Sequence, residues 1–138
     1  MNRSHRLHLQ QYNLLKLWNM RASIEEYKAV EKAALKITVI TGSPRKKGNS
    51  FAMTEAFVKA AEQRGHTIQR FDAAFLKIGG CHACMTCYKT GKACSFDDDF
   101  NLIAPAILES DAVVFSMPVY WYSIPAQIKG VIDRLFSL

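Results

Sequence analysis

The chain has 138 residues, of which 49% are hydrophobic and 22% charged, with a net charge of +6 and four cysteines. This composition excludes a disordered or fibrous protein, and the length predicts one main domain with its own hydrophobic core. Most of the positive excess lies in residues 1–36, where the cations are scattered among apolar residues. We therefore expect a solvated helical face there and no nucleic-acid partner.

The sequence contains no feature typical of membrane insertion or export. No apolar stretch approaches the ~18 residues of a membrane span. Near the start, Lys16 interrupts the apolar residues, whereas a signal peptide needs an unbroken apolar run. We expect no membrane partner and a cytoplasmic location.

Residues 1–35 are predicted to form a helical extension that precedes the main domain, residues 36–138. Apolar side chains recur at helical spacing in Leu9, Tyr12, Leu15 and Trp18. The run Ser23-Ile24-Glu25-Glu26 fits a capping box at the start of a second helix. This segment contains no catalytic motif.

From residue 36 the pattern changes to strands that alternate with helices. A strand is predicted for Ile37–Thr41 and another, at a sheet edge, for His66–Asp72. Between them we expect a helix that Ser50 caps and Gly65 ends. The apolar stripe expected to pack on the sheet consists of Met53, Ala56, Phe57 and Ala60.

The second half continues the same alternation after a long connection, residues 73–97, that holds the cysteines. A helix is predicted for Phe100–Ser110, with Asp97–Asp99 stabilising its start and Pro105 shortening or kinking it. The run Ala112–Met117 is predicted to be a central buried strand. Ser123, Ile124 and Pro125 then open a last helix that extends to Phe136.

Three successive strand–helix units predict an α/β fold with a parallel sheet, right-handed crossovers and helices on both faces. If the third strand lies beside the first, their carboxyl ends form a topological switch point, where ligands bind in such sheets. The loops 42–50 and 118–123 follow these two strands, and we expect the function to reside there.

The loop from Gly42 to Ser50 has the composition of a phosphate-binding turn. It leads from a buried strand into a helix, whose N-terminus offers unpaired N–H groups and partial positive charge. Hydroxyl, amide and guanidinium donors are provided by Ser43, Ser50, Asn49 and Arg45. The loop lacks both the dinucleotide glycine pattern and the Gly-Lys-Ser/Thr ending of a nucleotide triphosphatase, so a terminal phosphate monoester fits best. A plain strand-to-helix turn is the alternative.

The segment from Met117 to Pro125 places three consecutive aromatic residues, Tyr120 to Tyr122, after the third predicted strand. Bracketed by prolines, it would form a stiff apolar wall against which a flat conjugated ring could lie. The alternative is an aromatic loop that packs on the core or on a partner subunit.

Together these motifs resemble the flavodoxin-like NAD(P)H-dependent FMN reductase family over residues 36–138. The matching runs are Gly42-Ser43-Pro44-Arg45, Gly48-Asn49-Ser50, Ser116-Met117-Pro118-Val119-Tyr120-Trp121 and the helix Pro125–Arg134. The resemblance implies a flavodoxin-like doubly wound sheet that binds FMN. It implies a phosphate site of Ser43, Arg45, Gly48, Asn49 and Ser50, and a ring that lies along Pro118, Val119, Tyr120 and Trp121.

The four cysteines form the array Cys81-x2-Cys84-x2-Cys87-x6-Cys94. Thiolates this close in sequence can converge on one metal centre. Within the family the array looks like that of the iron–sulfur flavoproteins, which implies a [4Fe–4S] cluster. Zinc on the same thiolates, a dithiol of Cys84 and Cys87, and thiols without metal are the other interpretations.

The resemblance implies an FMN-dependent oxidoreductase that takes electrons from NAD(P)H or a reduced carrier and passes them, with a cluster as a relay, to a small-molecule or protein acceptor. The alternatives are a non-catalytic carrier similar to flavodoxin and an inactive partial flavin domain. No Ser-His-Asp or paired-carboxylate arrangement is present, so no catalytic side chain is assigned and the cofactor would carry the chemistry.

A complete domain of this type would contain two further strands after the last predicted helix. With three strands, the run Ala112–Met117 is left with an uncovered apolar edge, which favours pairing with another chain. We therefore expect a homo-oligomer.

Overall fold

The computed structural model describes residues 34–138, and its central element is the strand β1 (Lys36–Thr41). The five residues after Lys36 are all buried. An uninterrupted apolar and β-branched run of this kind is typical of a strand covered on both faces. The helices predicted within residues 1–33 lie outside the described residues.

Two strands flank β1 in a parallel sheet with the order β2-β1-β3. In the register, Ile37 lies opposite Ile68 of β2 (Thr67–Asp72) and opposite Ala112 of β3 (Ala112–Ser116). The predicted parallel α/β sheet and the pairing of the first and third strands are confirmed. The prediction that β3 is central and buried is wrong for this sheet, because β1 takes the middle place and all five β3 residues are half-buried.

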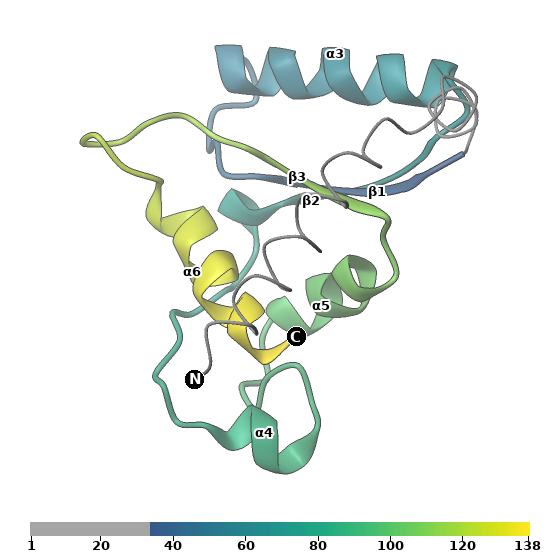
Figure 1. The fold of residues 1–138 in the computed structure, drawn as a ribbon. Coiled ribbons are helices and arrows are strands. Elements are labelled where there is room, and N and C mark those ends of the chain that lie inside the picture. The colour runs from purple at the N-terminus through teal and green to yellow at the C-terminus, as the bar shows by residue number, and fades with distance from the viewer. Residues whose placement is uncertain (1–33) are drawn as a thin grey trace, which may run out of the picture. The chain divides into compact units, whose positions relative to one another are not determined.

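One face of the sheet is covered by α3 (Asn49–Gln63), which lies on the opposite side from α5 and α6 in Figure 1. The buried side chains of this helix are Thr54 and Ala61, and Val58 packs beside Ala61 against the sheet. The predicted apolar stripe is therefore wrong, because the buried face lies about one position further along the helix. Met53, which was predicted to pack on the sheet, is 71% exposed.

The ends of α3 test two further predictions. The N-cap is Gly48 and Ser50 is already helical, so the predicted Ser50 cap is wrong. At the other end Gly65 has φ 86°, and its N–H bonds to the Glu62 carbonyl. The predicted glycine stop is confirmed, since only glycine adopts this left-handed conformation without strain.

The other face carries α5 (Phe100–Leu108) and α6 (Ala126–Arg134), which continues into the short 3-10 helix η2 (Leu135–Ser137). These helices pack on the sheet through a fully buried core: Ile40, Phe100, Ile103, Ile128 and Val131. Helices on both faces are thus confirmed (Figure 1). The helix that contains Pro105 ends two residues earlier than predicted.

The connection between β2 and α5 holds the cysteines and contains η1 (Ala73–Phe75) and a short helix, α4 (Thr86–Thr90), that the sequence did not predict. Its two ends are fastened together. Lys77 N–H donates to Asp99 Oδ2 at 2.7 Å, and Gly79 N–H donates to Asp98 Oδ2 at 3.1 Å. Asp98 Oδ1 also accepts the Phe100 N–H at 3.1 Å, so the acidic run stabilises the start of α5 as predicted. Among residues 34–138, no helix has the length and apolarity required to cross a bilayer.

Candidate functional site

The loops after β1 and β3 leave the sheet side by side. The N–H of Gly42, directly after β1, donates to the Ser116 carbonyl at the end of β3, at 2.9 Å. Gly42 is also tightly enclosed, because a Cβ atom there would lie 2.3 Å from Cγ1 of Ile128 and 3.3 Å from Cβ of Met117. The carboxyl ends of β1 and β3 and the start of α6 therefore meet at one point, the switch point of the sheet.

The first loop leads into a helix whose N-terminus is open. No side chain caps α3, and its first turn contains no acidic residue. Its N-cap, Gly48, has little room for a side chain, since a Cβ atom would lie 3.3 Å from the Arg45 carbonyl oxygen. The unpaired N–H groups and positive end of α3 are thus available to an anion.

Three consecutive cations, Arg45, Lys46 and Lys47, are exposed beside this helix end. None of them forms a salt bridge within residues 34–138, although Lys46 Nζ lies 4.9 Å from the centre of the Phe75 ring. Ser43 is buried, and its hydroxyl accepts the Arg45 N–H at 3.2 Å, which holds the turn. Cations and backbone N–H groups without an acid form a donor set that fits a phosphate.

A hydroxyl pair ties α3 to the end of β3. Thr54 Oγ1 lies 2.8 Å from Ser116 Oγ, and Thr54 also donates to the Ser50 carbonyl at 2.9 Å. These bonds fix the first turns of α3 relative to the second loop. This role of Thr54 was not predicted, because a threonine inside a helix shows no pattern that distinguishes a buried position from an exposed one.

The second loop ends in a tight two-residue hairpin with aromatic residues at its tip. Tyr120 and Ser123 exchange both backbone hydrogen bonds, at 2.9 and 3.0 Å. The residues between them, Trp121 and Tyr122, have φ 47° and 61° and are 92% and 96% exposed. Turns of this kind normally contain Asn-Gly, and bulky residues at positive φ are strained. A strained, exposed aromatic tip is typical of a functional loop. The sequence predicted the aromatic loop but not its hairpin turn, because the loop lacks the usual turn residues.

The structure therefore brings the two predicted groups together at one edge: Ser43, Arg45, Gly48, Asn49 and Ser50 in the first loop, and Pro118, Val119, Tyr120 and Trp121 in the second. Their chemistry fits FMN, which joins a terminal phosphate to a flat ring. Their contacts with a cofactor stay a prediction.

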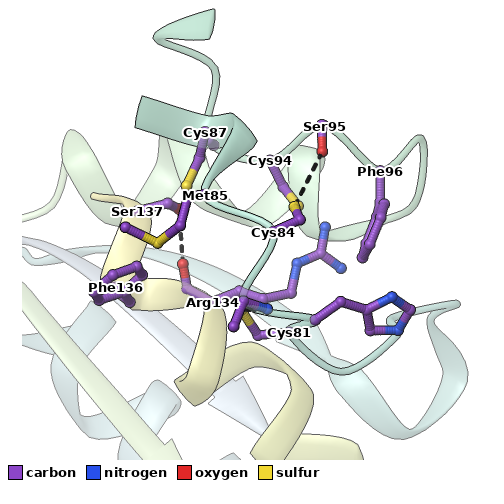
Figure 2. Close-up of a pocket in the computed structure, with 13 residues that line it drawn as sticks. Cys81, Cys84, Met85, Cys87, Cys94, Ser95, Phe96, Arg134, Phe136 and Ser137 are labelled. Carbon is purple, nitrogen blue, oxygen red and sulfur yellow. Dashed lines mark hydrogen bonds between the residues drawn. The ribbon is translucent and has the colours of Figure 1, made fainter. Parts of the chain in front are cut away.

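All four cysteines line a second pocket, which Figure 2 shows between α4, the following loop and the end of α6. We call it the cysteine pocket; His82, Phe96, Arg134 and Phe136 also line it. Each thiol is free, and within residues 34–138 no three metal-binding side chains already form a closed ligand set. Four thiols around one pocket fit a thiolate-bound metal in donor type, and such ligands commonly close around a metal as it binds.

Two charged side chains at the cysteine pocket, Arg134 and Asp98, form an ion pair. Arg134 Nη1 lies 2.5 Å from Asp98 Oδ2. Burial raises the pKa of Asp98, but hydrogen bonds from Arg134, Gly79 and Phe100 outweigh it, so this pKa lies below its ordinary value. For Arg134, burial lowers the pKa, but the hydrogen bond to Asp98 and, to a smaller extent, the nearby Cys94 outweigh that effect and raise it. Hydrogen bonds from Thr86 lower the pKa of the exposed Cys84 thiol. Arg134 was not predicted at this pocket, since it lies 36 positions from Asp98 and 40 positions from Cys94 in the sequence.

Several proteins are similar to this chain over about 100 residues. An iron-sulfur flavoprotein of Archaeoglobus fulgidus is 38% identical over 101 residues, which cover 73% of this chain and 46% of that protein. One of Methanosarcina thermophila is 33% identical over 100 residues, or 72% of this chain and 52% of that protein. The solved NAD(P)H:quinone oxidoreductase of Methanothermobacter marburgensis superposes with a TM-score of 0.60 at 25% identity, over 75% of this chain and 54% of that one.

The chain thus spans about half the length of the curated relatives it matches. Its own match to a family is extensive: residues 35–137 fit the sequence profile described as NADPH-dependent FMN reductase. This range includes both loops, the cysteine pocket and all three strands. The chain belongs to the NADPH-dependent FMN reductase family.

Proposed function

We propose that this chain is the FMN-binding part of an oxidoreductase that transfers electrons from NAD(P)H or a reduced carrier to a small-molecule or protein acceptor. One observation supports this proposal most directly. The uncapped, basic N-terminus of α3 and the exposed aromatic hairpin both lie at the switch point of the sheet. Family membership and relatives named iron-sulfur flavoproteins support the proposal.

The first loop would hold the phosphate of FMN. The exposed guanidinium of Arg45 would bind two phosphate oxygens at once, and the uncapped first N–H groups of α3 would donate to the same anion. Gly48 leaves room for a close approach of the backbone. No acidic side chain in the first turn of α3 would repel the phosphate.

The second loop would hold the ring. Tyr120 and Trp121 would offer apolar faces beside the switch point, and the two backbone hydrogen bonds of the hairpin constrain its backbone, which lowers the ordering cost of binding. Bound FMN would supply the electron-transfer chemistry, and the protein would supply its position and electrostatic surroundings.

The cysteine pocket would hold a metal centre, which we propose to be a [4Fe–4S] cluster that relays single electrons. The four thiols lie in one pocket, and the relatives' names point to iron and sulfur. α6 joins the two sites: its first turns follow the aromatic loop, and Arg134 at its end lines the cysteine pocket.

The proposal is tested by titrating the chain with FMN and with riboflavin, which lacks the phosphate, and following flavin fluorescence. We expect tighter binding of FMN than of riboflavin, with a difference that shrinks as salt is added. Arg45→Ala should weaken FMN binding by about 1–3 kcal/mol and leave riboflavin binding unchanged. Arg64→Ala, an exposed arginine at the other end of α3, is the matched control and should change neither.

Equal affinity for the two flavins would refute the phosphate site, and no binding of either would refute the FMN proposal for this chain. Steady-state oxidation of NADPH with an added acceptor then tests the enzymatic part. Bound FMN without turnover would favour the alternative of a non-catalytic electron carrier.

A further inference from the structure

The cysteine pocket contains an arginine that is buried far more deeply than is usual for this residue. The Arg134 side chain is only 2% exposed. Its guanidinium carbon lies 4.4 Å from the centre of the Phe100 ring and 5.6 Å from that of Phe96. A buried cation is costly unless it is paired and fully hydrogen-bonded, so its partners determine why it is there.

One nitrogen of the guanidinium joins the two ends of the segment that contains the four cysteines, residues 79–98, which we call the cysteine loop. Arg134 Nη1 donates to Asp98 Oδ2 at 2.5 Å and to the Gly79 carbonyl at 3.3 Å. Gly79 precedes the first cysteine and Asp98 follows the last, so Arg134 bridges the entrance and the exit of the loop. This contact satisfies Nη1 alone.

The other two nitrogens are buried without a partner. Nε and Nη2 of Arg134 find no hydrogen-bond acceptor among the described residues. Leaving buried donors unsatisfied costs about 1–3 kcal/mol each. In Figure 2 the guanidinium points into the cysteine pocket, below the sulfur atoms of Cys84 and Cys94, and Cys94 is near enough to affect its pKa.

A metal centre held by four thiolates would supply the hydrogen-bond acceptors that Nε and Nη2 of Arg134 lack. Four thiolates outweigh the positive charge of a divalent ion, so such a centre is anionic. Arginine suits it because its guanidinium is always charged, weakly hydrated and rich in N–H groups in fixed directions. Hydrogen bonds to the sulfur atoms of a metal centre also tune its reduction potential.

We propose that Arg134 binds the metal–thiolate centre directly, with Nε–H and Nη2–H donating to its sulfur atoms while Nη1 remains on Asp98. The positive charge then stabilises the centre, and more so in its reduced, more negative form. This inference rests on the metal-binding part of the proposed function and is independent of FMN binding.

The test separates direct binding from the fastening of the loop. Arg134→Gln removes the charge, and Arg134→Lys restores it without the directed N–H pair. Asp98→Asn removes the negative charge that anchors Arg134 but leaves the guanidinium in the pocket. Arg70→Gln is the matched control: Arg70 is also held by carboxylates, those of Glu55 and Asp72, and has a buried, unpartnered Nη2 in the described part of the chain, but it lies outside the pocket.

Each variant is checked for folding by circular dichroism and then titrated anaerobically with Co²⁺ alone, whose thiolate complexes are coloured. We expect Arg134→Gln to weaken Co²⁺ binding on the order of tenfold or more, the cost typical of groups that hold metal ligands, with partial rescue by lysine. Asp98→Asn should weaken it much less, and Arg70→Gln not at all. In iron-loaded protein, Arg134→Gln should shift the reduction potential to more negative values.

Equal losses in Arg134→Gln and Asp98→Asn would overturn the inference, because Arg134 would then act only by fastening the loop. An unchanged potential and Co²⁺ affinity in Arg134→Gln would overturn it as well. If the wild-type chain binds neither Co²⁺ nor iron, no anionic centre exists and the inference fails, whereas the FMN proposal is judged separately by the comparison with riboflavin.

Discussion

Gly42 and Ile128 are packed so closely that the addition of one carbon atom to Gly42 would place it 2.3 Å from Cγ1 of Ile128. Ile128 is fully buried in the core, so it cannot turn away into solvent. This contact joins the end of β1 to the first turns of α6, and hence the proposed phosphate loop to the helix that follows the aromatic loop.

The first prediction concerns this contact. Gly42→Ala should lower the free energy of unfolding by about 1–3 kcal/mol, because a closely packed core resists an added methyl group. Urea denaturation followed by circular dichroism measures it. Gly80→Ala is the control, since no atom lies within 4 Å of its added Cβ.

Ile128, the residue in contact with Gly42, provides a second part of the same test. Ile128→Ala removes the atoms that Gly42→Ala meets, so the double variant should lose less than the two single losses combined. We expect a coupling of about 0.5–3 kcal/mol. Additive losses would mean that Gly42 is required for another reason.

The second prediction concerns the hairpin tip. Replacing Trp121 and Tyr122 by Asn-Gly should raise the free energy of unfolding by about 1–2 kcal/mol, since both positions have positive φ. The same variant should bind FMN more weakly, because an aromatic face is lost. Tyr122→Phe keeps a bulky residue at this φ and should leave stability within about 0.5 kcal/mol. An Asn-Gly variant with no gain in stability would argue against strain in the turn.

The third prediction concerns the metal ligands. Cys84→Ser should abolish bound iron in anaerobically prepared protein and leave FMN affinity unchanged, because the thiolate is the ligand and the two sites are separate. Iron and acid-labile sulfide assays, together with the flavin absorption bands, provide the readout. Met85→Leu is the control, since Met85 lines the same pocket and supplies no thiolate. Iron that remains in Cys84→Ser would remove this cysteine from the proposed ligand set.

The fourth prediction concerns pH. The pKa of Asp98 is lower in the folded chain than its ordinary value, because the hydrogen bonds from Arg134, Gly79 and Phe100 outweigh the opposing effect of burial. The ionised group therefore stabilises the fold at pH values above about 4, and this contribution is lost as the pH falls through the folded pKa. Asp98→Asn should cost about 2–4 kcal/mol near neutral pH and progressively less below pH ~4.

Thermal unfolding between neutral and acidic pH checks the sign of this effect. The wild-type melting temperature should fall more steeply with acid than that of Asp98→Asn. Asp133→Asn, which removes an exposed pair with Lys129, should change stability by less than about 1 kcal/mol. Parallel curves for wild type and Asp98→Asn would contradict the role given to Asp98.

The sequence by itself determined the three strands and the main helices of residues 36–138, their order and the parallel sheet. The buried run before Gly42, the glycine at position 65 and the alternation of strands and helices depend on local periodicity and backbone preference, which one sequence displays directly. The clustering of the cysteines and of the basic loop was also visible there, because their members are neighbours in the chain.

Tertiary structure alone decided which face of α3 is buried and which distant side chains pair. Both Met53 and Thr54 lie on α3, and apolar residues occur on either side of that helix, so its pattern does not determine which face meets the sheet. The hydroxyl of Thr54 is acceptable inside because it bonds to Ser116 and to the Ser50 carbonyl. The pairing of Arg134 with Asp98, 36 positions apart, likewise exists only after α6 packs against the base of the cysteine loop. Partners this distant in the chain leave no local signal, since burial and charge pairing depend on the folded arrangement of the whole domain.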